Sequence, residues 1–174
     1  VLLFLLRGMP FVDLAFLRRC DLQGNVITYH RRKTSRKLTV VVGKEAMEII
    51  QKYMYAIPDS PYLFPIIQNP GKDEYGQYAR MLRLQNYRLT QVANILGIRD
   101  RLSTYTARHT WATTALRQNY NSSLICDAMG HSSVKVTETY FQPYRDDEVN
   151  RMNSSLITYI LSKKKRGTDK KIRS

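Results

Sequence analysis

Apolar residues recur along this chain with two different periods, and these periods predict its secondary structure. A repeat of three to four residues predicts helices, and runs rich in β-branched residues predict strands. The predicted helices cover residues 10–19, 44–56, 75–96, 106–118, 122–129 and 146–161, with one more short helix between 133 and 140. The predicted strands cover residues 25–30 and 37–42. The pattern therefore predicts a mainly α fold with a small antiparallel β-sheet, of the α+β class.

The longest predicted helix, 75–96, has a nearly continuous apolar face. The side chains expected to point toward the core are Tyr78, Met81, Leu82, Leu89, Val92 and Leu96. Prolines and glycines in residues 58–76 predict a loop before this helix, with the short apolar run 62–64 as the exception.

The last predicted helix, 146–161, also has an apolar face. This face suits packing on the core of its own chain or on a neighbouring copy; its members are Val149, Met152, Leu156, Ile157, Ile160 and Leu161. Residues 163–174 hold seven Lys or Arg and one Asp without an apolar period. They are expected to form a basic tail that is disordered when free. The predicted division is a domain over 1–162 and a tail over 163–174.

The charge of the chain changes the picture from a fold to a class of partner. With 28 Lys and Arg against 14 Asp and Glu, the formal net charge of the 174 residues is +14. Such an excess favours a polyanion, because each neutralised phosphate releases condensed counterions. Ribosomal-type basic proteins and basic membrane-surface proteins share this composition, so charge alone does not separate these classes.

The composition offers little support for a cofactor, a metal or a membrane anchor. Cys20 and Cys126 each lie in an apolar helical pattern, so both are expected to be buried free thiols. No Cys and His pair has zinc-ligand spacing. The apolar opening of residues 1–6 is too short to span a bilayer and has no charged leader. We expect a core helix there, in a fragment of a longer protein.

Three separated motifs carry the candidate chemistry. They are Thr-Tyr-Thr-Ala-Arg-His-Thr-Trp-Ala-Thr at 104–113, Met-Gly-His-Ser-Ser at 129–133 and Thr-Glu-Thr-Tyr at 137–140. They place Arg108 23 residues before His131, and Tyr140 nine residues after it. A guanidinium can hold phosphate oxygens with its planar fork, and an imidazole can donate to a developing oxyanion. Since a phenol can act as a covalent nucleophile, the set suits attack on a phosphodiester.

This order and spacing resemble the tyrosine recombinase (phage integrase) family. The resemblance implies the catalytic-domain fold of that family, preceded by a helical DNA-binding domain that this sequence lacks. It also implies cleavage and rejoining of double-stranded DNA through a 3′-phosphotyrosyl intermediate, with no metal or cofactor. The resemblance further implies a homo-tetramer on DNA, a monomer in solution, and accessory proteins that bend DNA or set directionality.

The resemblance also implies roles for individual residues. Tyr140 would be the nucleophile, with Tyr144 as its nearby rival. Arg108 would stabilise the pentacoordinate phosphorane, assisted by His131. Lys33, in the turn Arg-Arg-Lys-Thr, would protonate the leaving 5′ oxygen. His109 is expected to be structural, because the helix should aim it elsewhere.

Two positions depart from the family pattern. Tyr105 stands where relatives have a histidine, so it is a candidate site residue with an altered role. The first catalytic arginine of relatives would fall at Pro10. Arg7 lies one helical turn earlier and is our candidate for this arginine, because a shift of one turn keeps a side chain on a similar side. Arg31, on the hairpin, is the alternative donor.

The remaining expectations concern DNA, location and rival functions. Basic hairpin residues are expected to contact phosphates, which position a protein without reading sequence; they are Arg31, Arg32, Arg36 and Lys37. The resemblance implies a bacterial, cytoplasmic protein of the nucleoid, with no membrane contact. A type IB topoisomerase and a catalytically inactive DNA-binding module of the same fold stay open as alternatives.

Overall fold

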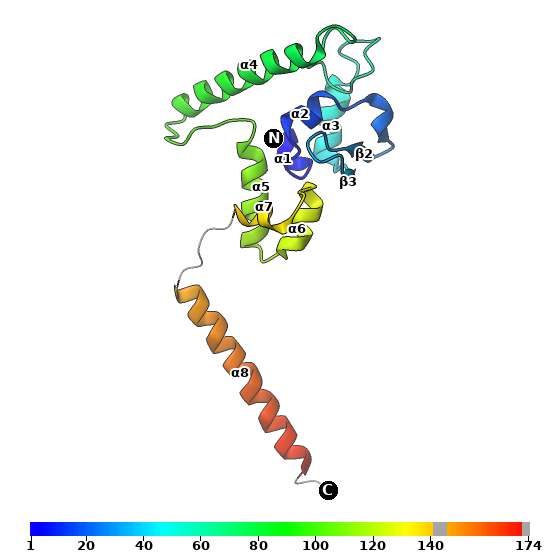
Figure 1. Ribbon diagram of the computed structural model, residues 1–174. Helices are drawn as coiled ribbons and strands as arrows, with labels where there is room; N and C mark the ends of the chain where they lie inside the picture. Colours follow the sequence, from blue (N-terminus) through cyan, green and yellow to red (C-terminus); the bar gives the residue numbers. More distant parts are fainter. Residues whose placement is uncertain (141–145, 172–174) are drawn as a thin grey trace. The chain divides into compact units, whose positions relative to one another are not determined.

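The computed structural model describes residues 1–140 and 146–171, with side chains described up to Tyr159. The chain forms two compact units, one ending at Phe141 and one beginning at Gln142. Helices and a three-stranded antiparallel sheet, in the order β1-β2-β3, confirm the predicted fold class (Figure 1). The elements are α1 (Leu2–Leu5), α2 (Phe11–Ala15), a 3₁₀ helix (Arg19–Asp21), β1 (Leu22–Gln23), β2 (Val26–His30), β3 (Lys37–Val41), α3 (Lys44–Tyr53), α4 (Glu74–Ile95), α5 (Thr106–Arg117), α6 (Ser122–Met129), α7 (Val134–Glu138) and α8 (Asp146–Lys171).

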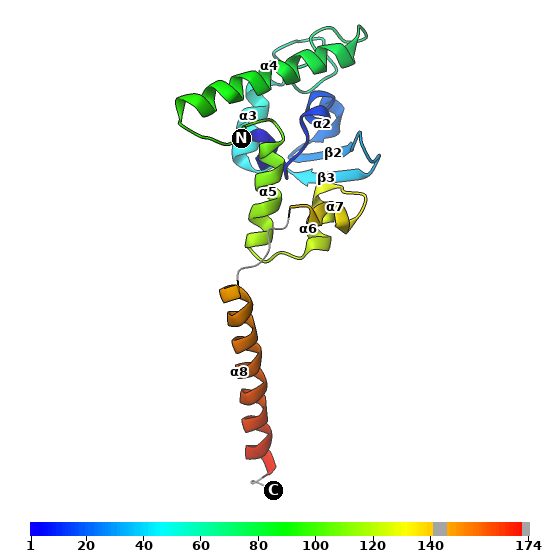
Figure 2. The same cartoon turned by 60° about the vertical axis from the view of Figure 1, so that its left-hand side comes forward.

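The hairpin of β2 and β3 forms one wall of the main core. Its side chains alternate between buried and exposed, as expected for strands with one face on a core. The pair Tyr29 and Leu38 lies opposite in the ladder, and both side chains are buried. Helices α2 and α3 supply further buried apolar side chains to this core, and the segments after α1 and α2 and the loop run 63–66 supply most of the others. β2 and β3 lie between α2 and the α6–α7 pair, which places the turn of the hairpin beside both (Figure 2).

The predicted helix over 10–19 is wrong beyond its first half. α2 ends at Ala15, because the chain then turns extended and pairs with a distant segment. The Leu63 N–H donates to the Leu17 carbonyl at 2.7 Å, and Arg18 forms an isolated bridge with Tyr62. The run 62–64, predicted as the exception within the loop, is therefore buried. The two-residue strand β1 was not predicted.

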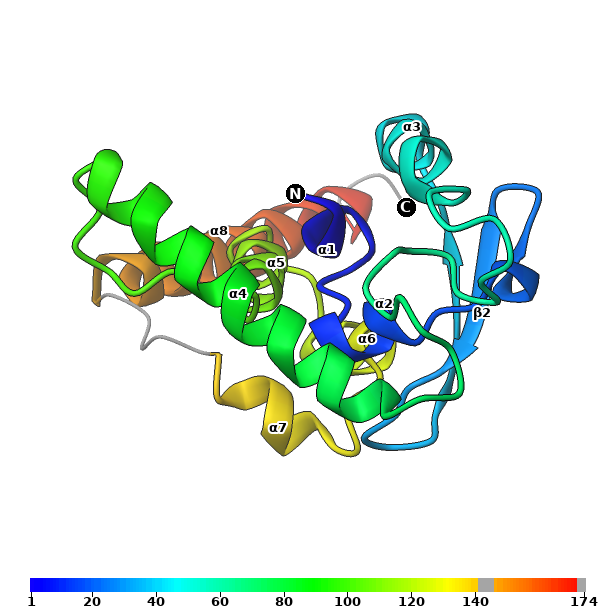
Figure 3. The same ribbon diagram turned by 90° about the horizontal axis from the view of Figure 1, so that it is seen from above.

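The predicted apolar face of α4 is only partly buried. Tyr78 and Met81 pack against the core, but Val92 and Leu96 are 45% and 65% exposed. A helix of 22 residues is roughly 33 Å long. The five-residue helix α2 contacts only a short part of it. α4 passes above α2 and α5 (Figure 3), and toward its end Ala93 is buried while Val92 on the apolar stripe is not.

Two expectations from composition also need correction. The sequence predicted a helix that ends near 161, but α8 continues to Lys171; disorder of the basic tail in the free chain stays a prediction. Lys and Arg are good helix formers, so a missing apolar period does not end a helix. Cys20 is exposed because it lies in the 3₁₀ helix, whereas Cys126 is buried as predicted. Among the described residues, no helix is long and apolar enough to cross a bilayer.

Close contact between the α1–α2 turn and α5 depends on Gly8. Gly8 has φ +66°, and a Cβ atom built there would lie 3.0 Å from the Arg108 Cα. Its carbonyl accepts a hydrogen bond from Arg108 Nη1 at 2.8 Å. A side chain at this position would separate the two segments and disturb the arginine.

Gly8→Ala is expected to lower the free energy of unfolding by about 2–4 kcal/mol, because a left-handed backbone cost adds to an overpacking cost. Gly24→Ala is the matched control, since Gly24 has φ +59° and open space around it. The control should lose only about 1–2 kcal/mol. Urea unfolding of both variants measures the difference, and equal losses would contradict the close packing at Gly8.

Candidate active site

Three segments far apart in the sequence bring the predicted residues together. Arg108 lies in the first turns of α5, His131 follows the end of α6, and Tyr140 follows α7. α5 packs on α6, and α6 packs on α7. The start of α5 is fixed by hydrogen bonds of the preceding loop, in which the Thr104 N–H donates to Asn86 Oδ1 at 2.8 Å. Helix packing therefore converts the spacing of the motifs into proximity.

Arg108 is buried, with 2% of its surface exposed. Its Nη1 donates to the Gly8 carbonyl and its Nη2 to the Met129 carbonyl, each at 2.8 Å. Burial and the charge of Arg31 lower the pKa of Arg108, although an arginine stays cationic in proteins. The two carbonyls hold the plane of the guanidinium between α6 and the α1–α2 turn, which fixes its direction.

His131 is held beside this arginine as a neutral imidazole. Gly130, with φ +63°, ends α6 in the left-handed conformation, and the His131 N–H donates to the Cys126 carbonyl at 3.0 Å. The His131 Nδ1 lies 2.8 Å from Thr137 Oγ1. Burial, with the charges of Arg108 and Arg31, lowers the pKa of His131 to about 4. The ring is therefore uncharged at neutral pH.

Tyr140 is buried against these groups, with 5% of its surface exposed. Its ring stacks on the His131 ring, with centroids 5.8 Å apart and planes 3° apart. Its hydroxyl lies 2.5 Å from the Tyr105 hydroxyl. Burial and the Tyr105 hydrogen bond raise the pKa of Tyr140 to about 12, against the opposing charge of Arg108. The phenol is therefore protonated at neutral pH. The rival, Tyr144, lies outside the described residues.

Two further side chains meet the Tyr140 ring or hydroxyl. Tyr105, immediately before α5, is itself exposed but reaches the Tyr140 hydroxyl. The His109 ring lies 5.1 Å from the Tyr140 ring, centroid to centroid. The expectation that α5 aims His109 elsewhere is therefore wrong. His109 follows Arg108 directly, and the segment after α7 brings the Tyr140 ring against His109.

The basic hairpin turn is tied to the end of α6. Arg31 is 7% exposed, and its Nη1 donates to the Gly130 carbonyl at 2.5 Å. Thr34 Oγ1 donates to the same carbonyl at 3.2 Å, and Arg36 donates to the His131 carbonyl at 3.1 Å. Lys33 is exposed in this turn, close enough to help lower the pKa of His131. The turn thus places an exposed lysine beside the buried site.

The predicted DNA contacts of the hairpin divide into internal and exposed groups. Arg31 is internal, and Arg36 is partly engaged by a 2.8 Å ion pair with Asp127. The Arg32 guanidinium lies 3.8 Å from the centre of the Phe16 ring, although its side chain is exposed. Lys37 is exposed at the start of β3. Arg32 and Lys37 therefore remain the accessible candidates for phosphate contacts.

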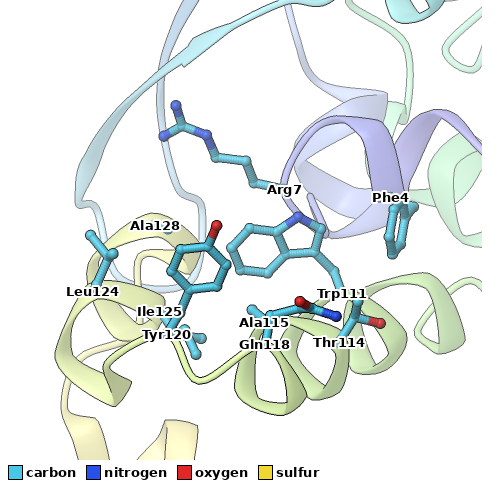
Figure 4. Close-up of a pocket in the computed structure, with 10 residues that line it drawn as sticks. All are labelled: Phe4, Arg7, Trp111, Thr114, Ala115, Gln118, Tyr120, Leu124, Ile125 and Ala128. Carbon is cyan, nitrogen blue, oxygen red and sulfur yellow. The ribbon is translucent and has the colours of Figure 1, made fainter.

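Arg7 and Pro10 do not lie one turn apart on a helix, so our reason for predicting Arg7 as the first catalytic arginine does not hold. α1 ends at Leu5 and Arg7 has φ +59°, so the helical spacing that we assumed does not exist there. Arg7 Nη1 donates to the Thr39 carbonyl at 3.2 Å. The side chain lines a cavity of about 650 Å³, beside Trp111 and Tyr120 (Figure 4).

Pro10 lines a different cavity, of about 290 Å³, together with Tyr105 and Arg108. The position where the resemblance expects an arginine therefore does border the candidate site, but it carries no charge. Asp13, which the sequence analysis did not single out, is buried nearby and accepts a hydrogen bond from the Arg32 N–H at 2.9 Å. An acidic residue within an apolar helix could have signalled it. Among the described residues, no group of three His, Cys, Asp or Glu could hold a metal ion.

Comparison with known proteins decides the family. Residues 4–146 match the model of the phage integrase family. This stretch is most of the chain and contains all three motifs. The chain belongs to the phage integrase family.

Curated relatives agree with this membership. A tyrosine recombinase of Pseudothermotoga lettingae is 32% identical over 60 residues, which are 34% of this chain and 21% of the relative. Tyrosine recombinase XerC of Thermodesulfovibrio yellowstonii is 25% identical over 135 residues, which are 71% of this chain and 42% of the relative. This chain thus aligns with less than half the length of either relative.

Solved structures confirm the expected catalytic-domain fold. A crystal structure of XerA recombinase has a TM-score of 0.64 at 21% identity, covering 88% of this chain and 55% of that one. The Tn1549 transposon integrase, in complex with transposon right end DNA, has a TM-score of 0.61 at 17% identity, covering 90% and 57%. The XerH site-specific recombinase bound to difH substrate has a TM-score of 0.59 at 15% identity, covering 88% and 45%. At such low sequence identities, the structural similarity shows a shared fold, which is that of the phage integrase family.

The lowered pKa of His131 predicts a loss of stability in mild acid. Unfolded His131 takes up a proton near pH 6.5, whereas the folded protein resists it down to about pH 4. Between these values the unfolded state binds more protons, so stability falls as the pH falls. Full protonation of His131 should lower the free energy of unfolding by about 3 kcal/mol.

Urea unfolding from pH 7 to pH 4 measures this loss. His131→Gln should remove the His131 contribution to the fall of the unfolding free energy with pH. His30→Gln, at the exposed end of β2, should retain that contribution. A His131→Gln variant with the wild-type slope would show that His131 is not the group concerned.

Proposed function

We propose that this chain is the catalytic domain of a site-specific DNA recombinase that cleaves and rejoins strands through Tyr140. The observation that carries the proposal is the burial of the Tyr140 phenol against the guanidinium and imidazole of Arg108 and His131. Membership of the phage integrase family and a net charge of +14 support duplex DNA as the substrate. The Tn1549 integrase and XerH structures, each in complex with DNA, are consistent with it.

The proposed reaction is a transesterification. The Tyr140 oxygen attacks phosphorus, the bond from phosphorus to the 5′ oxygen breaks, and a 3′-phosphotyrosyl ester forms. The Tyr140 proton passes to the Tyr105 hydroxyl, which lies 2.5 Å away and can relay it to solvent because its side chain is exposed. Lys33 donates a proton to the leaving 5′ oxygen. A 5′ hydroxyl from another strand can then reverse the attack, which exchanges partners.

Arg108 and His131 would stabilise the charge that builds up on the phosphoryl oxygens. The Gly8 and Met129 carbonyls hold the Arg108 guanidinium in place before the substrate arrives, so little reorganisation is needed. If the Thr137 hydroxyl donates to His131 Nδ1, the neutral ring carries its proton on Nε2 and can donate it to an oxygen. Removal of one preorganised donor of this kind typically costs roughly 10²–10³ in rate.

We also propose that copies of the chain associate on DNA as a homo-tetramer, with α8 docking into a neighbouring copy. On α8 the apolar side chains of Val149, Met152 and Leu156 are each about half exposed. The 650 Å³ cavity beside Trp111 is apolar and open to such a helix. Light scattering of DNA complexes should give a lower mass for a chain ending at residue 145, and equal masses would reject docking by α8.

Tyr140→Phe tests the proposed nucleophile. This variant should form no covalent adduct with a nicked DNA that traps the intermediate, while its DNA affinity stays close to that of the wild type. Tyr120→Phe is the matched control, because Tyr120 is exposed on the other cavity and should react normally. Adduct at the normal yield in Tyr140→Phe would reject Tyr140 as nucleophile.

The same assay separates the alternatives. DNA binding without adduct by the wild type, on every site tested, would favour an inactive binding module; Pro10 beside Arg108 is the observation that favours it. Relaxation of supercoiled plasmid without recombinant products would favour a topoisomerase.

A further inference from the structure

We infer that Arg31 supplies the second guanidinium to the reacting phosphate, from the hairpin rather than from α2. This inference rests on the proposed function, because it names a further catalytic residue of the same site. Arg31 follows the last residue of β2, whereas the position where the resemblance expects an arginine, just before α2, carries Pro10 and borders the site. The chain thus replaces a helix arginine by a hairpin arginine.

Arg31 and Arg108 bind the same turn of backbone, at the end of α6. Arg108 donates to the carbonyl of Met129, and Arg31 donates to the carbonyl of the next residue, Gly130. His131 follows directly. A Cβ atom on Gly130 would lie 3.2 Å from the Arg31 Cδ, so the arginine packs closely on this glycine. Two guanidinium groups therefore bind consecutive carbonyls immediately before the site histidine.

Arg31 also retains hydrogen-bonding capacity that the folded protein leaves unused. A guanidinium has five N–H donors. Among the described residues, the buried Arg31 Nε has no hydrogen-bond partner, and Asp13 Oδ2, which also lacks one, lies 3.9 Å away. A buried, unpaired donor is costly for a residue that only stabilises the fold. Such a donor is expected where an anion binds later.

The charge of the site points the same way. Arg31, Arg108 and Lys33 all act on His131, and Arg31 acts on Arg108, so the cations lie close together. Asp13 is the one carboxylate within ion-pair distance of Arg31 in the described part of the chain. Like charges gathered around a single carboxylate repel one another until an anion joins them. A phosphodiester carries one negative charge, and its pentacoordinate state gains more, so a second cation is most useful there.

The alternative role for Arg31 is structural: it would only tie the hairpin to the end of α6. Arg7 is the alternative source of a second cation, but it lines the separate cavity beside Trp111. These readings differ in one respect. A catalytic Arg31 acts on the charge of the reacting phosphate, whereas a structural Arg31 acts regardless of that charge.

A charge-neutral substrate therefore separates the two roles. The experiment compares Arg31→Ala, Arg7→Ala and the wild type on trapping DNA with either a normal phosphodiester or a methylphosphonate at the cleaved position. On the phosphodiester, Arg31→Ala should form adduct roughly 10²–10³-fold more slowly than the wild type. On the methylphosphonate, which lacks the negative charge, Arg31→Ala should react faster than it does on the phosphodiester. Arg7→Ala should match the wild type on both.

The remaining outcomes are equally informative. If Arg31→Ala lost the same factor in adduct rate on both substrates, the assignment of Arg31 would be overturned. It would also be overturned if the methylphosphonate restored the rate of Arg7→Ala instead. Arg31→Gln, whose amide can still donate to the Gly130 carbonyl, serves if Arg31→Ala does not fold, and the same rescue is expected of it. Absence of adduct from the wild type would reject the proposed function itself. A reactive wild type with an equally reactive Arg31→Ala would reject only the role of Arg31.

Discussion

The site depends on one short stretch of backbone, the end of α6. Three consecutive carbonyls, of Met129, Gly130 and His131, accept hydrogen bonds from arginines of two other elements. Arg108 comes from α5, and Arg31 and Arg36 come from the hairpin. The carbonyls at a helix C-terminus carry partial negative charge, so cations are favoured there. This interaction joins the sheet, α5 and the α6–α7 turn, and it holds the charged groups before any substrate binds.

The same interaction explains the electrostatic state of the site. Burial, together with the arginines fixed near His131, lowers the pKa of the imidazole and keeps it neutral, and Arg108 partly opposes the effect of burial on the pKa of the Tyr140 phenol. Tyr140 nevertheless remains protonated, which suits a nucleophile that should not react without DNA. The Tyr105 hydroxyl is then placed to receive the proton. A histidine at position 105 would be basic near neutral pH, whereas a phenol acts as a weaker relay.

The sequence predicted the fold class and the meeting of Arg108, His131 and Tyr140, since the spacing of the motifs carries that information. It did not predict the environment of Arg7, because α1 ends early and the next turn has a positive φ, which no apolar period signals. His109 was misplaced for a related reason. Which residue a side chain on α5 faces is decided only when the segment that carries Tyr140 folds against that helix. The exposed end of α4 shows that an apolar stripe reports potential for burial, not burial itself.

The central claim, that Tyr140 becomes joined to DNA, is tested most directly by locating the attachment. A trapped adduct would be digested with nuclease and trypsin, and the peptide that retains a nucleotide would be sequenced by mass spectrometry. We predict the modified peptide 136–145, with fragment ions that place the nucleotide on Tyr140 rather than on Tyr144. A nucleotide on Tyr144, or on the neighbouring hydroxyl of Tyr105 in peptide 102–108, would contradict the claim.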